Sequence, residues 1–245
     1  MNGSLAMHAN LSASLDRADE LLKELLAEYD RSLRSKEVST RAVQLTHEVC
    51  ERLRSVLDRL VRRYWDLRVA PALSADDKKA ATVYFPIASD QNGFDSILGR
   101  WRWKGVRAQH QPVYDYLLAR QPFANANNAW LTVLNDLAVQ GKHIDLVPQV
   151  RQESKRITVA QTQGGGTVSW DPSSVKFGSG VFIHGVPVDP ATQRVVPHPS
   201  VEERIETWVS FNIQGHGVNA AGFCQEACHS TRSITNDMSN KFGLS

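Results

Sequence analysis

The chain has 245 residues, of which 42% are hydrophobic and 22% are charged, and its formal net charge is +2. This length suffices for one large domain, or two small ones, with a buried core. A net charge so close to zero gives no overall field that would attract nucleic acid or an anionic membrane, so such binding would need a local patch.

The cysteines and the N-terminal end indicate in which cellular compartment the protein is expected. The chain has three cysteines, Cys50, Cys224 and Cys228. Because this number is low and odd, a disulfide framework is not expected, and a reducing compartment is favoured. The N-terminal end lacks the basic and apolar regions of a secretory signal. No apolar run approaches the ~20 residues that span a bilayer. We therefore expect a cytoplasmic protein with no membrane partner.

Two long amphipathic helices are predicted at the start of the chain. Apolar residues recur in steps of three and four over 11–33 and again over 42–67. Ser39 or Thr40 can cap the second helix, which ends before Pro71. Neither stretch contains Gly or Pro, so both favour helices that pair as an antiparallel hairpin.

The middle of the chain is less regular. The run TVYFPI at 82–87 is interrupted by a proline and suits an edge strand or an extended connector. The glycine-containing stretch at 93–110 suits a short helix or a loop. Two further helices are predicted, over 112–121, where a proline occupies the first turn, and over 126–140.

The pattern changes to strands after residue 150. Strand residues are predicted around 157–159, 168–170, 181–188 and 205–213. The sequence Asp-Pro-Ala-Thr at 189–192 predicts a hairpin turn, and the three glycines at 164–166 predict a tight turn and not a phosphate loop, since no Lys-Ser/Thr follows.

A closing helix is predicted beyond Gly217, and a helix of this length needs a partner surface. The helical N-terminal half is the obvious one. The sequence therefore predicts an α+β fold, with a helical bundle over 1–150, an antiparallel β insertion over 151–215 and a C-terminal helix over 216–245 that packs back on the bundle.

The densest group of chemically capable side chains lies in and after the helix at 126–140. Asn135 is on that helix, and Lys142 and His143 follow its end. If Asp58 reached His143, its carboxylate would fix the tautomer of the ring and raise its basicity. These four residues are our catalytic candidates. The alternative is structural, because a cation at a helix C-terminus is stabilised by the helix dipole.

A local basic and aromatic segment is the candidate for nucleic-acid binding. It comprises Arg100, Trp101, Arg102, Trp103, Lys104 and Arg107. Exposed indoles can stack on unpaired bases while the cations contact phosphates. Arg52, Arg59 and Arg63 form a stripe on the second helix that could extend the patch. In the alternative interpretation both tryptophans pack under the loop and the arginines pair with acids.

A cysteine and histidine group near the C-terminus has some features of a metal site. Cys224 and Cys228 share a helix face, with His229 and His216 nearby, but His229 points about 100° away from Cys228 on a helix. No fourth ligand has suitable spacing. Both cysteines lie on the apolar stripe, so we interpret them as core residues and expect no metal and no cofactor.

Several short motifs resemble a recurrent group of uncharacterised bacterial helical proteins. They are the stretch 53–58, the Tyr-Phe-Pro-Ile run at 84–87, Gln-Pro-Phe at 121–123 and the stretch 134–143. The helices of that group are similar to those of the HEPN superfamily, which includes RNA-cleaving toxins and defence proteins. The resemblance implies a HEPN-like helical bundle and a connection to RNA. It covers roughly Leu53 to Leu146.

The chain departs from the group's pattern at two places. Arg59 stands where the group usually has His after Asp58, and Gly141 and Ile144 replace the outer residues of its Asp-Lys-His-Arg motif. The resemblance therefore carries over only to Asp58, Asn135, Lys142 and His143, to which the group assigns no role.

HEPN nucleases use an Arg and a His separated by four to six residues, and Arg41 and His47 have that spacing. The His would act as general base while the Arg stabilises the charged phosphorane. On one helix, however, the two residues lie about 240° apart. A metal-independent ribonuclease with His47 or His143 as base is therefore an alternative hypothesis.

These observations together favour a HEPN-like protein that binds RNA or a partner protein in bacterial stress response or phage defence. A third hypothesis is a structural or assembly module, since long helices with many charges often dimerise. A homo-oligomer is expected in either case.

Overall fold

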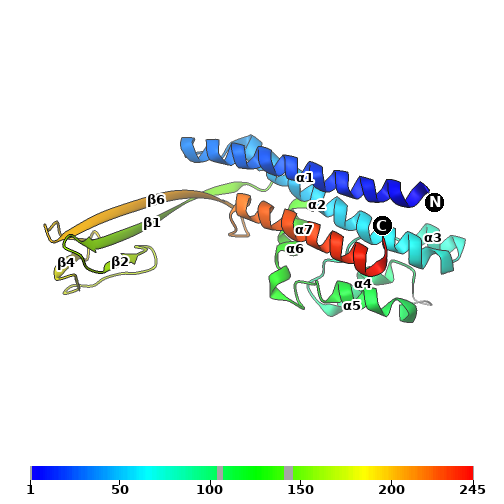
Figure 1. The fold of residues 1–245 in the computed structure, drawn as a ribbon. Coiled ribbons are helices and arrows are strands. Elements are labelled where there is room, and N and C mark those ends of the chain that lie inside the picture. The colour runs from blue at the N-terminus through cyan, green and yellow to red at the C-terminus, as the bar shows by residue number, and fades with distance from the viewer. Residues whose placement is uncertain (1, 104–106, 141–145, 245) are drawn as a thin grey trace. The chain divides into compact units, whose positions relative to one another are not determined.

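The computed structural model describes residues 2–103, 107–140 and 146–244. The chain divides into two compact units, which we call the helical unit (residues 1–149 and 213–245) and the β unit (residues 150–212). Figure 1 shows the helices of the first unit and the strands of the second. The predicted α+β class and the position of the last helix after the strands are confirmed.

Three long helices build the helical unit, namely α1 (Asn2–Ser35), α2 (Thr40–Tyr64) and α7 (Ala220–Phe242). The predicted cap of α2 is confirmed, because Ser39 Oγ accepts a hydrogen bond from the Ala42 N–H at 3.0 Å. Helix α2 packs against α1, α6 and α7 and is the central helix of the unit (Figure 1). The final helix therefore shares a core with the first two.

Shorter elements complete the helical unit. They are η1 (Trp65–Val69), η2 (Ala70–Ala72), α3 (Ala75–Ala80), α4 (Gln91–Gly99), η3 (Arg107–His110), α5 (Gln111–Leu118), η4 (Ala126–Asn128) and α6 (Trp130–Gln140). The run 82–87 is an extended connector and not a strand. Helix α3 was not predicted, because it buries no side chain and so shows no apolar period; Ser74 caps it instead.

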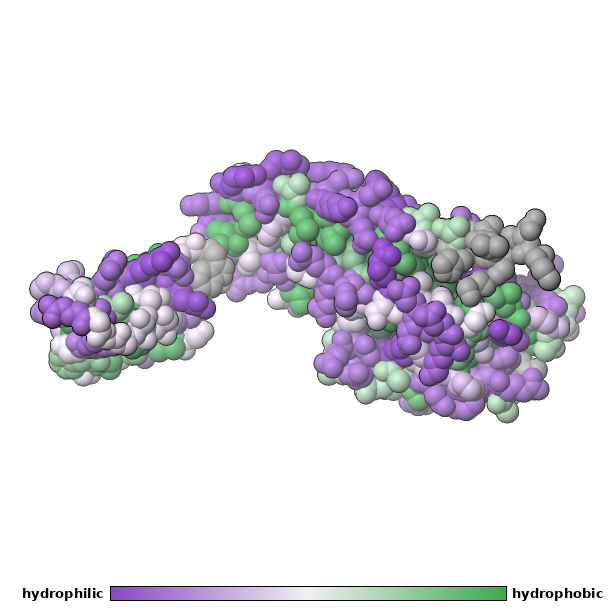
Figure 2. Space-filling view, viewed as in Figure 1, coloured by the Kyte–Doolittle hydropathy of each residue, from purple (hydrophilic) through white to green (hydrophobic). Residues whose placement is uncertain are grey.

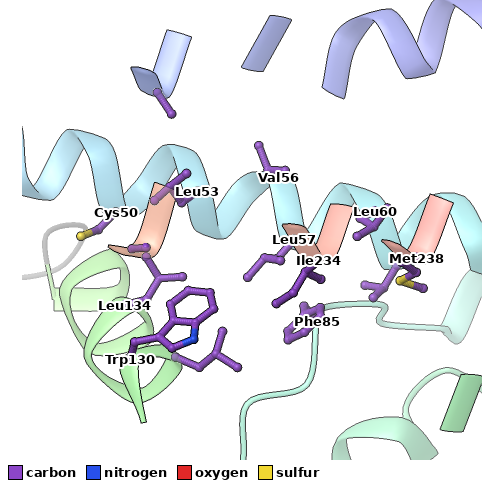
Figure 3. Close-up of a cluster of buried hydrophobic side chains, with 14 of the residues drawn as sticks. Cys50, Leu53, Val56, Leu57, Leu60, Phe85, Trp130, Leu134, Ile234 and Met238 are labelled. Carbon is purple, nitrogen blue, oxygen red and sulfur yellow. The ribbon is translucent and has the colours of Figure 1, made fainter. Parts of the chain in front are cut away.

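The core of the helical unit gathers around one face of α2. Figure 3 shows Leu53, Leu57 and Leu60 of α2 beside Leu134 of α6 and Met238 of α7. These side chains are essentially inaccessible to solvent. Burying a leucine side chain contributes about 1.5–3 kcal/mol, so the period-3.6 pattern of α2 accounts for the assembly of three helices around it.

The β unit contains two small antiparallel sheets. One has the strand order β2-β1-β6, and the other has the order β3-β4-β5. The strands are β1 (Gln149–Gln161), β2 (Thr167–Trp170), β3 (Phe182–Ile183), β4 (Val186–Asp189), β5 (Arg194–Val195) and β6 (Val201–Ile213). The predicted turns at 164–166 and 189–192 are where the sequence placed them.

The predicted strand region 181–188 is a hairpin and not one strand. Residues His184 and Gly185 both have positive φ, at 52° and 79°, and Ile183 pairs directly with Val186. A two-residue turn with positive φ at both positions matches the twist of the flanking strands. The turn was not predicted, because Gly185 is its only sequence signal and lies within an apolar run.

The β unit has a small core of its own. It comprises Ile157, Val159, Trp170, Ile183, Val186, Val188 and Val195. All of these residues lie between 157 and 195, while β1 residues 150–153, 155 and 156 are exposed. The clean period-two pattern of β6 does form a strand, but Ile205 and Thr207 on its apolar face remain exposed.

Candidate functional site

The candidate catalytic residue Asp58 bonds to the backbone of the extended connector. Its Oδ1 accepts a hydrogen bond from the Phe85 N–H at 2.8 Å. Arg54, one turn earlier on α2, donates to the Phe85 carbonyl at 3.0 Å and lies 3.2 Å from the Asp58 carboxylate. Burial lowers the pKa of Arg54, and the nearby Asp58 opposes that shift. The two side chains thus replace the strand partner that this segment lacks.

Gln121 completes this framework and is fully buried. Its Oε1 accepts from the Ala88 N–H at 3.1 Å, and its Nε2 donates to the Pro86 carbonyl at 3.0 Å and the Leu117 carbonyl at 2.9 Å. Hydrogen bonds therefore join the motif residues of α2, the connector and the Gln-Pro-Phe segment. Their joint occurrence has a structural reason that needs no reaction.

Asp58 and Asn135 are not brought into one described cluster. Asn135 is partly buried on α6, and its side chain makes no hydrogen bond among the described residues. Leu137 of α6 lies beside His47, which precedes Asp58 by three turns, or about 16 Å along α2. Lys142 and His143 lie outside the described residues, so the contact expected between His143 and Asp58 stays a prediction.

His47 is a buried structural histidine. Its Nδ1 is 3.0 Å from the Leu137 carbonyl, and its Nε2 is 2.9 Å from the Val147 N–H. Because a carbonyl only accepts and an N–H only donates, the ring is the neutral Nδ1–H tautomer with both nitrogens engaged. His47 therefore has no free nitrogen with which to take a proton from a substrate.

Arg41 does not join His47. Its guanidinium lies at the surface, 2.8 Å from Glu48 and 3.1 Å from Glu24. The ring of His47 is inside, against the end of α6. The Arg–His arrangement on which the His47 version of the ribonuclease hypothesis depends is therefore not formed, as the angle between the two positions on α2 indicates.

The tryptophans expected to stack on bases are core residues. Trp101 and Trp103 are 0% and 2% exposed, and their ring centroids are 5.0 Å apart. The Trp65 indole donates to the Trp101 carbonyl at 2.8 Å. We therefore correct their expected role, since base stacking needs an open aromatic face. The pattern of alternating aromatic and basic residues reflects alternate burial: Arg100 and Arg102 are exposed.

Trp103 stacks on a second buried ring, that of His110, with the planes 17° apart. The His110 Nδ1 is 2.8 Å from the Tyr64 hydroxyl. Burial lowers the pKa of His110 and raises the pKa of Tyr64 to about 12. Both groups are therefore neutral in the folded protein near neutral pH.

The expected arginine stripe is divided between surface and interior. Arg63 is 2% exposed and bonds to the Leu244 carbonyl, so it is corrected to a core residue. Arg59 is exposed and donates to Ser14 at 3.1 Å. Arg107 lies over the Tyr114 ring and 3.5 Å from Asp95, while Lys104 is outside the described residues. The described arginines therefore do not gather on one surface, since Arg63 is in the core and Arg59 bonds to α1.

The three cysteines are buried and unpaired. Cys224 lies against Cys50 in the core, and the hydrogen bond with Cys50, together with burial, raises the pKa of the Cys224 thiol. Burial likewise raises the pKa of Cys228 to about 12. Within the described residues, no group of three or more potential metal ligands is assembled. Both C-terminal cysteines thus pack as the small core residues that the apolar stripe of α7 indicates.

An apolar row on the β unit was missed by the sequence analysis. Phe182 pairs with Pro187, and the Val196 N–H donates to the Pro187 carbonyl at 2.9 Å, so the three residues are direct neighbours across β3, β4 and the end of β5. All three are exposed, while Ile183 and Val186 beside them are buried. We call these three residues the apolar row. Figure 2 shows hydrophobic surface on this unit.

A hollow of about 600 Å³ lies at the start of α7 in the helical unit. Its apolar lining includes Trp130, Val133, Val218 and Phe223. We call it the α7 hollow. A second and more polar hollow of about 460 Å³ adjoins it, and the two share Trp130 as a lining residue. The sequence offered one signal, a glycine (Gly222) inside an otherwise regular helix.

No family model, no curated protein and no solved structure matches this chain. Among the described residues, no helix combines the length and apolar character needed to cross a bilayer.

Proposed function

We propose that the chain is a binding protein whose β unit recognises a partner protein. The observation that carries the proposal is the distribution of exposed apolar side chains. Of ten large hydrophobic residues that are exposed in the described part of the chain, six belong to the β unit. That unit holds only about a quarter of the residues, and two of the six, Phe182 and Val196, flank Pro187 in the apolar row.

The charge of the β unit favours a protein over RNA. The unit contains six basic and six acidic residues, so it has no net charge to attract phosphates. Protein interfaces centre on apolar and aromatic side chains, and Phe182 is 62% exposed at one end of the apolar row. RNA binding remains the competing outcome of the test.

The finer expectations from the sequence belong to the same proposal. The kinship of the helical unit with HEPN proteins belongs to the proposal and is supported by the short motifs of the sequence, of which those at 53–58, 84–87 and 121–123 are joined by hydrogen bonds. A cytoplasmic location and a role in stress response or defence are part of the proposal, supported by the three unpaired cysteines. The partner protein could be a second copy of this chain, as in a homo-oligomer.

Photo-crosslinking in cells tests the proposal. A benzophenone amino acid replaces Phe182, and the control carries it at Tyr84, which is 55% exposed on the helical unit. We expect a discrete protein adduct from position 182 that Val196→Asp abolishes, and none from position 84. An adduct of twice the chain's mass would identify a second copy. Equal labelling at both positions, or RNA as the species crosslinked by ultraviolet light, would contradict the proposal.

A further inference from the structure

The α7 hollow has the size and lining of a small-molecule site. Pockets for small ligands measure roughly 300–1,000 Å³ and are mostly apolar with a few polar groups. The hollow, at about 600 Å³, combines the apolar side chains of Trp130, Val133, Val218 and Phe223 with the polar His216 and Glu226. A whole protein would need a contact of about 800 Å² on this chain, which favours a small ligand here.

Gly222 keeps one wall of the hollow open. A Cβ atom built at this position meets only Asn219 Oδ1, at 3.5 Å, so a side chain would fit there and occupy free space. Glycine in a helix is less stable than alanine by about 1 kcal/mol. Neither a turn nor a close backbone approach requires glycine at this point of α7. Its one evident structural consequence is the space that it leaves.

Among the described residues that line the hollow, Glu226 is the one carboxylate. Glu226 is exposed and has no cationic partner among the described residues. The His216 Nε2 lies 4.0 Å from Asp136 Oδ2, so a second carboxylate stands behind the imidazole. Among the residues that the structure describes, neither lysine nor arginine lines the hollow. A bound cation would therefore gain from the Glu226 carboxylate.

We propose that the α7 hollow binds a small apolar molecule that carries one cationic group, that is, a hydrophobic amine. The apolar body of the ligand packs against Trp130, Val133 and Phe223, and its ammonium group lies toward Glu226. The inference is independent of the proposed function, because it concerns the helical unit and uses no residue of the apolar row.

Three matched probes test the charge requirement, namely 4-phenylbutylamine, 4-phenylbutanol and 4-phenylbutyrate. Binding to the full chain is measured by isothermal titration calorimetry. We expect the amine to bind about tenfold more tightly than the alcohol, as one charge-assisted contact provides, and the butyrate to bind more weakly than both. Equal affinities for the three probes, or no binding of the amine, would overturn the proposal.

Two variants locate the site. Gly222→Leu fills the hollow from a helix position that tolerates leucine, so the protein should keep its circular dichroism spectrum and lose amine binding. Gln225→Leu, on an exposed neighbour that does not line the hollow, is the control and should bind as before. Glu226→Gln should lower the affinity for the amine to the affinity for the alcohol. Undiminished amine binding by folded Gly222→Leu would place the amine elsewhere and refute the assignment.

Discussion

The two units differ in where their informative residues lie. In the helical unit several of them are in the interior, and in the β unit they are exposed to solvent. In the helical unit, several residues that suggested chemistry or recognition are buried or hydrogen-bonded within the unit: Asp58 bonds to the connector, His47 to the end of α6, and Trp101 and Trp103 lie in the core. In the β unit, the apolar row is outside although apolar side chains are usually buried. The comparison teaches that residue type alone gave the tryptophans a wrong role and left the apolar row unnoticed, because the role of a side chain depends on its exposure.

The largest expected effect comes from breaking the framework of the helical unit. Asp58→Ala leaves the Arg54 guanidinium without its carboxylate and the Phe85 N–H without its acceptor. We expect the free energy of unfolding to fall by about 3 kcal/mol, measured by urea denaturation.

The control for this prediction is a second Arg–Asp pair at the same spacing. Arg62 and Asp66 also lie four residues apart, with their charged atoms at 2.9 Å, but both side chains are well exposed. Asp66→Ala should change the free energy of unfolding by less than about 1 kcal/mol. Equal effects of the two substitutions would show that the connector is not held by Asp58.

A smaller effect on the free energy of unfolding is expected when the pH is lowered, because His110 becomes protonated. Burial lowers its pKa below the ordinary 6.5, so between the two values the unfolded chain binds more protons than the folded one. The stabilising contribution is fully present above pH 6.5 and is lost as the pH falls toward the folded pKa. Denaturation midpoints between pH 7.5 and 5 measure this loss.

His110→Gln is the matched variant, because glutamine keeps a hydrogen-bonding side chain beside the Tyr64 hydroxyl but does not titrate. Its stability should depend less on pH across the same interval than that of the wild type. An unchanged pH dependence would assign the effect to other groups and leave the aromatic cluster without a role in it.

The smallest expected effect sharpens the contrast within the β unit. Phe182→Ala should alter the free energy of unfolding by no more than about 0.5 kcal/mol, because the ring is exposed. Ile183→Ala, one residue on, removes a buried side chain and should cost about 2 kcal/mol or more. If Phe182→Ala were as destabilising as Ile183→Ala, the apolar row would be part of the core and unsuited to partner binding.

Much of the fold follows from periodicity along the chain. The steps of three and four before residue 67 predicted α1 and α2, Ser39 predicted the start of α2, and period-two alternation predicted β6. These signals are local, since each residue's place on a helix or strand depends on its neighbours in sequence. The hairpin at 183–186 was not predicted, because its turn signal is a single glycine inside an apolar run.

The candidate site was less predictable, because its residues meet only after folding. Trp101 and Arg100 are adjacent in sequence, yet one is buried and the other is exposed. Asp58 and Phe85 are 27 residues apart, and nothing in their local patterns indicates a bond between them. Gly222 and Trp130 come from helices far apart in the chain and line one hollow.

The sequence by itself thus determined most of the helical and strand segments, though not α3 or the hairpin at 183–186, and it placed a helix after the strands, since these features depend on local periodicity. Only the tertiary structure decided which polar groups are satisfied internally and which apolar groups face solvent. The physical reason is that burial and hydrogen bonding are properties of residue pairs distant in sequence, fixed when α2, the connector, α6 and α7 pack together.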